Sequence, residues 1–268
     1  MNALRFPIPG FRFNFLIFPF SLLTACGSID PPPPVNDEGE PIPFPAPYET
    51  WLQIKSIAPA TDEDIPLQPV LEITFTDYID PATFTTYGVL ALQSGGIIAA
   101  GDVEYSMAER TLRWTPRRLL EPGFAYRLVL FETGISSVTG SPLIAPARMP
   151  RYIVDEDATI ESTLPRQTVR WADIEPIFDA KCASCHGDAR WGLPELTHDV
   201  LVDTRSEQVE HMLVRPFDPT RSYLMHKILP DYPLRRFTVQ PPPWFEERSP
   251  LSDEEIGLIE AWIRQGAR

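Results

Sequence analysis

The sequence of 268 residues predicts two folded parts of different class, an all-β sandwich over residues 50–155 and an all-α unit over residues 166–268. The first prediction rests on short segments in which apolar and polar residues alternate, with turn-forming Pro, Gly and Asp between them. The second rests on apolar residues at helical spacing on both sides of a Cys-x-x-Cys-His motif. A proline-rich stretch before the sandwich predicts an extended tether over residues 26–49.

Residues 1–25 have the pattern of an export signal. Arg5 and Arg12 precede a mostly apolar run over residues 13–23, which Asn14 and Pro19 interrupt. A helix needs about 20 apolar residues to span a bilayer, so this run is too short to do so. A basic start followed by a short apolar run is typical of a secretory signal peptide.

The sequence around Cys26 resembles the lipobox of bacterial lipoproteins, because residues 23–27 read LTACG. The resemblance implies that residues 1–25 are removed and that Cys26 becomes the lipidated first residue, anchored in a membrane by its acyl chains. In that family, Gly27 after the cysteine favours the outer membrane, with the protein facing the periplasm or the cell surface. The alternative is a plain signal peptide that leaves Cys26 as a free thiol.

The tether and the net charge limit the partners of the chain. Residues 31–34 are four consecutive prolines, and every second residue from 41 to 47 is proline. Polyproline II rises about 3.1 Å per residue, so the tether would hold the folded parts about 60 Å from the anchor. The net charge of −14 opposes binding to nucleic acid and to anionic lipid.

Alternating residues predict short strands in the middle third of the chain. Leu71, Ile73 and Phe75 alternate with Glu72 and Thr74, which is the period of a half-buried strand. The same alternation occurs over residues 103–105, 112–114 and 126–130, and Pro or Gly separates these segments. Several short strands at this spacing predict a β-sandwich.

Residues 73–83 read ITFTDYIDPAT and resemble the F-S-x-x-M-D-P-x-T segment of bacterial Ig-like domains found in cell-surface proteins. Residues 112–116, 120–126 and 140–143 resemble later segments of the same family in the same order. The resemblance implies an Ig-like sandwich over residues 50–155 that serves as a spacer or an interaction module, and we assign no catalysis to it.

Cys182, Cys185 and His186 form a Cys-x-x-Cys-His motif, the attachment signature of c-type haem. Thiols at this spacing can form thioether bonds to the two haem vinyl groups, and the histidine can bind the iron as the proximal ligand. The alternatives are a redox Cys-x-x-Cys pair and half of a zinc site. These need a thioredoxin-like context or a second pair of metal ligands, and the sequence displays neither.

Helical patterns lie on both sides of this motif. Trp171, Ile174 and Phe178 recur at helical spacing before it. At the far end, Ser252 and Glu255 have the spacing of a capping box at the start of an apolar stripe over residues 256–263.

Four segments, residues 177–187, 222–228, 251–256 and 262–267, resemble a large bacterial family of cytochrome c domains. The resemblance covers residues 166–268. It implies one covalent haem c, a class I-like cytochrome c fold and electron exchange with a redox partner protein.

The chain departs from that family at the distal iron ligand. The family has Met-Pro-Pro before the terminal helix, whereas this chain has Gln240, Pro241 and Pro242. We expect Met225 as the distal ligand, because it lies on an apolar stripe of the helix predicted from residue 222. The alternatives are His226, His211, Met212, or a position that is open or filled by Gln240 or water.

Together these patterns predict a membrane-anchored c-type cytochrome that transfers electrons at the cell envelope and is more an electron carrier than an enzyme. One alternative is a haem-based sensor of small ligands, or a peroxidase-like enzyme, with an open distal site. Another is a surface interaction module that carries the cytochrome as a passenger. No catalytic residue is assigned in any of these interpretations.

Overall fold

The computed structural model describes residues 51–83, 90–130, 135–144, 146, 148–157, 167–188, 193–235, 239–242 and 250–268. The predicted signal peptide, the lipidated Cys26 and the tether lie outside these residues. All described residues belong to one compact unit, Pro45–Arg268. Within them, no helix is both long enough and apolar enough to cross a membrane.

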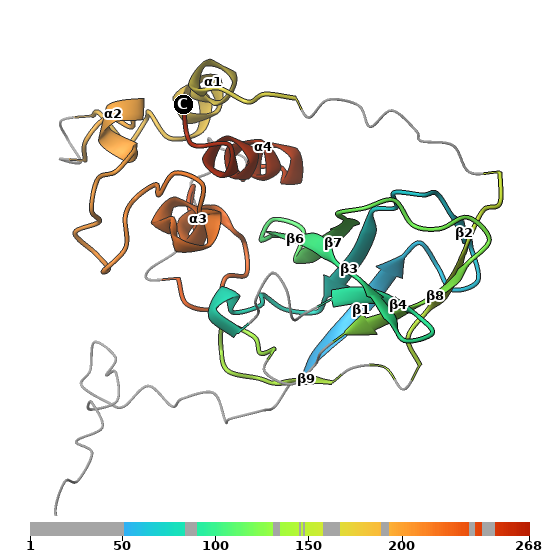
Figure 1. Ribbon diagram of the computed structural model, residues 1–268. Helices are drawn as coiled ribbons and strands as arrows, with labels where there is room; N and C mark the ends of the chain where they lie inside the picture. Colours follow the sequence, from blue (N-terminus) through green and yellow to red (C-terminus); the bar gives the residue numbers. More distant parts are fainter. Residues whose placement is uncertain are drawn as a thin grey trace, which may run out of the picture. The chain divides into compact units, whose positions relative to one another are not determined.

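Two five-stranded sheets occupy the first half of this unit (Figure 1). Their strand orders are β6-β7-β3-β1-β9 and β2-β10-β8-β4-β5, and among these described strands β1–β9 and β2–β10 pair in parallel. The bounds of the strands are β1 Leu52–Ala58, β2 Asp64–Ile65, β3 Leu71–Phe75, β4 Leu90–Ser94, β5 Ile97–Ala99, β6 Gly101–Ser106, β7 Thr111–Pro116, β8 Ala125–Leu130, β9 Leu143–Ile144 and β10 Arg151–Val154.

The alternation that predicts a strand over residues 71–75 is confirmed by β3. Leu71, Ile73 and Phe75 are buried, whereas the residues between them are half-buried. Trp114 of β7 is fully buried in the same core. A Cβ on Gly101 would lie 2.1 Å from the Trp114 ring, so this close approach of backbone to indole requires glycine.

Four helices follow in the described part of the chain: α1 Trp171–Lys181, α2 His198–Leu201, α3 Tyr223–Ile228 and α4 Asp253–Arg264. Short 3₁₀ turns lie at Pro81–Thr83 and Pro219–Arg221. Helices α1 and α4 pack through Trp171 and Trp262, whose ring centroids are 5.5 Å apart. The predicted capping box is confirmed, since Ser252 Oγ accepts from the Glu255 N–H and a Glu255 carboxylate oxygen accepts from the Ser252 N–H.

The predicted fold class, an Ig-like sandwich followed by an all-α cytochrome c domain, is wrong. The protein is sheet-rich, with two five-stranded sheets and few helices among the described residues. Helices α2 and α3 have only four and six residues. The described chain between α1 and α4 is mostly turns, joined by isolated bridges such as Val202–Val214 and Met212–Ser222. Prolines recur along this stretch and prevent longer helices.

The sheets and α4 are joined by the buried carboxylate of Glu260, which is 1% exposed. It accepts hydrogen bonds from Ser106 Oγ (2.9 Å) and from the N–H groups of Met107 (2.8 Å) and Ala108 (3.1 Å), in the turn between β6 and β7. Arg264 pairs with the same carboxylate at 2.7 Å. A buried charge is tolerated only when its hydrogen bonds are made, so these contacts fix α4 against the turn.

Candidate functional site

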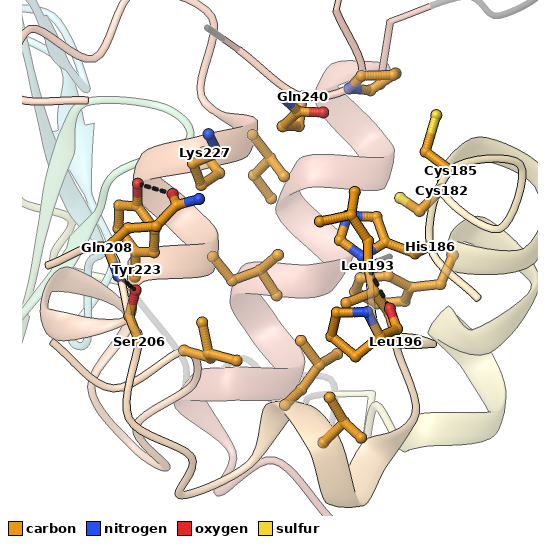
Figure 2. Close-up of a pocket in the computed structure, with 18 of the residues that line it drawn as sticks. Cys182, Cys185, His186, Leu193, Leu196, Ser206, Gln208, Tyr223, Lys227 and Gln240 are labelled. Carbon is orange, nitrogen blue, oxygen red and sulfur yellow. Dashed lines mark hydrogen bonds between the residues drawn. The ribbon is translucent and has the colours of Figure 1, made fainter. Parts of the chain in front are cut away.

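A cavity of about 820 Å³ lies between α1, α3 and the loops around them (Figure 2). This volume is within the range of small-molecule and cofactor sites. Much of its lining is apolar, as such sites require. The apolar lining residues are Phe178, Leu193, Pro194, Leu196, Val200, Leu201, Leu213, Leu224, Ile228, Pro241 and Pro242.

The end of α1 brings Cys182, Cys185 and His186 together on one side of this cavity, here called the proximal wall. Cys182 closes the helix with its N–H on the Phe178 carbonyl at 2.8 Å. The N–H groups of Cys185 and His186 then donate to the Cys182 carbonyl at 3.1 and 3.0 Å. This tight turn places three residues that are close in sequence on the same wall.

The ring of His186 has one nitrogen bonded and one available. Its Nδ1 lies 3.0 Å from the carbonyl oxygen of Pro194. A carbonyl can only accept, so Nδ1 carries the proton and Nε2 keeps its lone pair. Burial also lowers the pKa of His186, which favours the neutral ring. A neutral imidazole oriented through its other nitrogen is the usual form of a metal-binding histidine.

Cys182 and Cys185 are half-buried, and no disulfide joins them. Ser184 Oγ lies 3.8 Å from the Cys185 sulfur, within range of a weak hydrogen bond. The proximal wall therefore offers two thiols and one imidazole nitrogen to an apolar cavity, a donor set that fits a covalently bound haem. Across the described residues, no group of three or more His, Cys, Asp or Glu side chains is placed to hold a metal ion.

Met225, the expected distal ligand, is fully buried and is not among the lining residues of the cavity. His226 also turns away. Its ring stacks on Tyr232 with centroids 4.4 Å apart, and its Nε2 bonds to the Thr220 carbonyl at 3.0 Å. Of the four histidines and five methionines in the sequence, His186 alone is found among the described residues that line the cavity.

Helix α3 instead presents Tyr223, Leu224, Lys227 and Ile228 to the cavity, and this surface is here called the far wall. Figure 2 shows Lys227 and Tyr223 across the cavity from the two cysteines. Gln240 also lines the cavity, and its N–H donates to the Lys227 carbonyl at 2.8 Å. The apolar stripe of the helix is therefore divided: Leu224 and Ile228 line the cavity, whereas Met225 is buried in the core.

Lys227 lines the cavity, although the sequence analysis does not single it out. Burial, and to a smaller degree the nearby Arg235, lower the pKa of its ammonium. Its amine also lies 5.9 Å from the centroid of the Tyr223 ring. Its position in the sequence could have indicated this, because Lys227 is three residues after Leu224 and directly before Ile228, both of which line the cavity.

No protein-family model and no curated protein matches the chain. The S-layer protein rSbsC is similar in part, with 17% identity over 45% of this chain and 16% of that chain and a TM-score of 0.30. CopC from Methylosinus trichosporium OB3b has 12% identity over 41% of this chain and 99% of its own, with a TM-score of 0.30. An L,D-transpeptidase from Mycobacterium smegmatis has 11% identity over 40% and 41%, with a TM-score of 0.29. The chain thus spans about a sixth of that S-layer structure, and these similarities carry no argument about function.

Proposed function

We propose that this chain is a c-type haem protein that carries single electrons at the cell envelope. The proposal is carried by the proximal wall, where the thiols of Cys182 and Cys185 and an available imidazole nitrogen line one largely apolar cavity. A haem held there would supply a one-electron iron couple.

The chain's own residues would hold that cofactor and tune it. Cys182 and Cys185 would form the thioether bonds, and His186 Nε2 would bind the iron. The hydrogen bond from His186 Nδ1 to Pro194 fixes the ring orientation and strengthens Nε2 as a donor. The apolar lining would limit solvent access, which is one of the factors that set a reduction potential.

The envelope location is part of the same proposal. Lipidated Cys26 would anchor the protein, with the outer membrane favoured, and the tether would leave it free to meet a redox partner protein at the periplasmic face or the cell surface. The support for this comes from the sequence of residues 1–49.

A redox titration of the matured full-length protein tests electron transfer. We expect uptake and release of one electron per chain, fully reversible. The double variant Cys182→Ala with Cys185→Ala should lose covalently bound haem, whereas the matched control Cys26→Ser should retain the haem and leave the membrane fraction. Absence of a reversible one-electron couple in haem-loaded protein would overturn the proposal.

The far wall favours a second candidate, a haem protein that binds a small ligand as a sensor or a peroxidase-like enzyme. Its described lining has neither a methionine nor a second histidine to occupy the distal position strongly. Carbon monoxide separates the candidates. A ferrous spectrum that changes at once on CO addition supports ligand binding, and a spectrum indifferent to CO supports an electron carrier with a filled sixth position.

A further inference from the structure

A second cavity of about 390 Å³ lies on the sheet β2-β10-β8-β4-β5, apart from the candidate haem site. Two of its six lining residues are arginines, and a third is a glutamine. The lining residues are Gln93, Gly95, Ala125, Tyr126, Arg127 and Arg151.

The strand register explains why the polar side chains gather there. Gln93 of β4 lies directly opposite Arg127 of β8, and Arg127 lies directly opposite Arg151 of β10. Directly opposite residues share a face of the sheet, with their Cβ atoms about 5 Å apart. Gln93, Arg127 and Arg151 therefore form one row across three neighbouring strands.

Arg127 and Arg151 are both exposed, and they place two positive charges directly opposite each other on one face of the sheet. Like charges directly opposite each other destabilise a sheet. The sequence has 37 acidic residues, yet no described residue makes an ion pair or a side-chain hydrogen bond with either guanidinium. The backbone N–H of Asp62 donates to the Arg151 carbonyl at 2.9 Å. The Asp62 carboxylate nevertheless forms no ion pair with the Arg151 guanidinium. By contrast, Arg113 and Arg117 of the same sandwich both pair with carboxylates.

We propose that this cavity binds an oxyanion, a phosphate or carboxylate group, between Arg127 and Arg151. Guanidinium groups match both kinds of anion with two parallel hydrogen bonds each. A bound anion would lie between the two positive charges and offset their repulsion. Gln93, whose Nε2 donates to the Gly95 carbonyl at 3.3 Å, closes one end of the row. This site is independent of the haem and of the proposed electron transfer.

Calorimetric titration of the full chain with inorganic phosphate, and separately with acetate, tests the proposal at ionic strength held constant with sodium chloride. We expect saturable binding of at least one of the two anions. Arg127→Gln and Arg151→Gln should each weaken it at least about tenfold, because each removes charge-assisted hydrogen bonds to the anion. The matched control is Arg118→Gln, an exposed arginine of the same sandwich outside the cavity, which should bind as the wild type does.

Thermal unfolding of the variants without added phosphate shows whether a loss of binding reflects a loss of the folded state. Arg151→Gln should melt at or above the wild-type temperature, because it relieves repulsion, so its loss of binding will not reflect unfolding. Heat no different from that of sodium chloride alone, or equal weakening by Arg118→Gln, would overturn the site. Haem loading and redox behaviour do not enter either measurement.

Discussion

The two sides of the large cavity are built in different ways. The proximal wall comes from five consecutive residues at the end of α1 and is held by local hydrogen bonds and by Pro194. The far wall comes from α3 together with Gln240, which contacts the helix from a separate loop. A wall made by one short segment can be predicted from its motif, whereas a wall assembled from distant segments depends on packing.

The largest effect is expected from a substitution in the proximal wall. His186→Ala removes the imidazole nitrogen available to the iron, so the absorption spectrum of the haem-loaded protein should change in both oxidation states. Added imidazole should restore the wild-type spectrum, since the substitution leaves space for it in the cavity. His198→Ala is the control, because His198 does not line the cavity. An unchanged spectrum in His186→Ala would contradict the assignment.

Met225→Ala separates packing from ligation on α3. Met225 is fully buried, so truncation should lower the free energy of unfolding by about 2–5 kcal/mol. Because its side chain does not line the cavity, the haem spectrum and the reduction potential should stay at wild-type values. Loss of stability is measured by denaturant unfolding. A spectrum altered together with stability would show that Met225 reaches the iron after all.

His226, also on α3, should make the stability of the protein depend on pH. Burial, with a smaller contribution from His211, lowers its pKa to about 4, compared with about 6.5 in an unfolded chain. The unfolded state therefore binds more protons between these values, and stability should fall by about 3 kcal/mol as the pH falls from 6.5 to 4. His226→Phe should flatten this part of the pH profile. A profile equally steep in wild type and variant would rule out His226 as its source.

Gln240→Met has the smallest expected effect and tests whether position 240 can supply a distal ligand. The variant restores the Met-Pro-Pro sequence of the cytochrome c family that the chain resembles. A thioether at this position should raise the reduction potential and slow CO binding about tenfold, which corresponds to about 1.4 kcal/mol. Gln208→Met adds a thioether beside Tyr223 and is the matched control, expected to leave the potential unchanged. Equal shifts in the two variants would show that the position of the sulfur is immaterial.

The success of the sequence predictions follows the range of the interactions involved. The β3 alternation and the Ser252–Glu255 capping box are local, and the structure confirms both. Cys182, Cys185 and His186 are also close in sequence and line one cavity, whereas their attachment to haem stays a prediction. The predicted fold class is wrong because it infers an all-α domain from the helical patterns at its two ends. The described chain between them makes turns and isolated bridges that leave no periodic signal.

The far wall and the contact of α4 with the sheets could not be predicted for the same reason. Glu260 has the sequence position of an ordinary solvated residue on a helix, yet its partners are N–H groups of a turn more than 150 residues earlier. The orientation of α3 is also decided by packing. Its six residues carry apolar side chains on two faces, so hydrophobic spacing alone does not distinguish the face toward the core from the face toward the cavity.

The most direct test of the central claim is the mass of the mature protein after denaturation, following expression with haem-maturation machinery. The account predicts a mass greater by one haem, a chromophore that stays with the protein in acidified organic solvent, and loss of both in the Cys182→Ala and Cys185→Ala double variant. A wild-type mass equal to that of the polypeptide alone, or a haem that the solvent extracts, would contradict it.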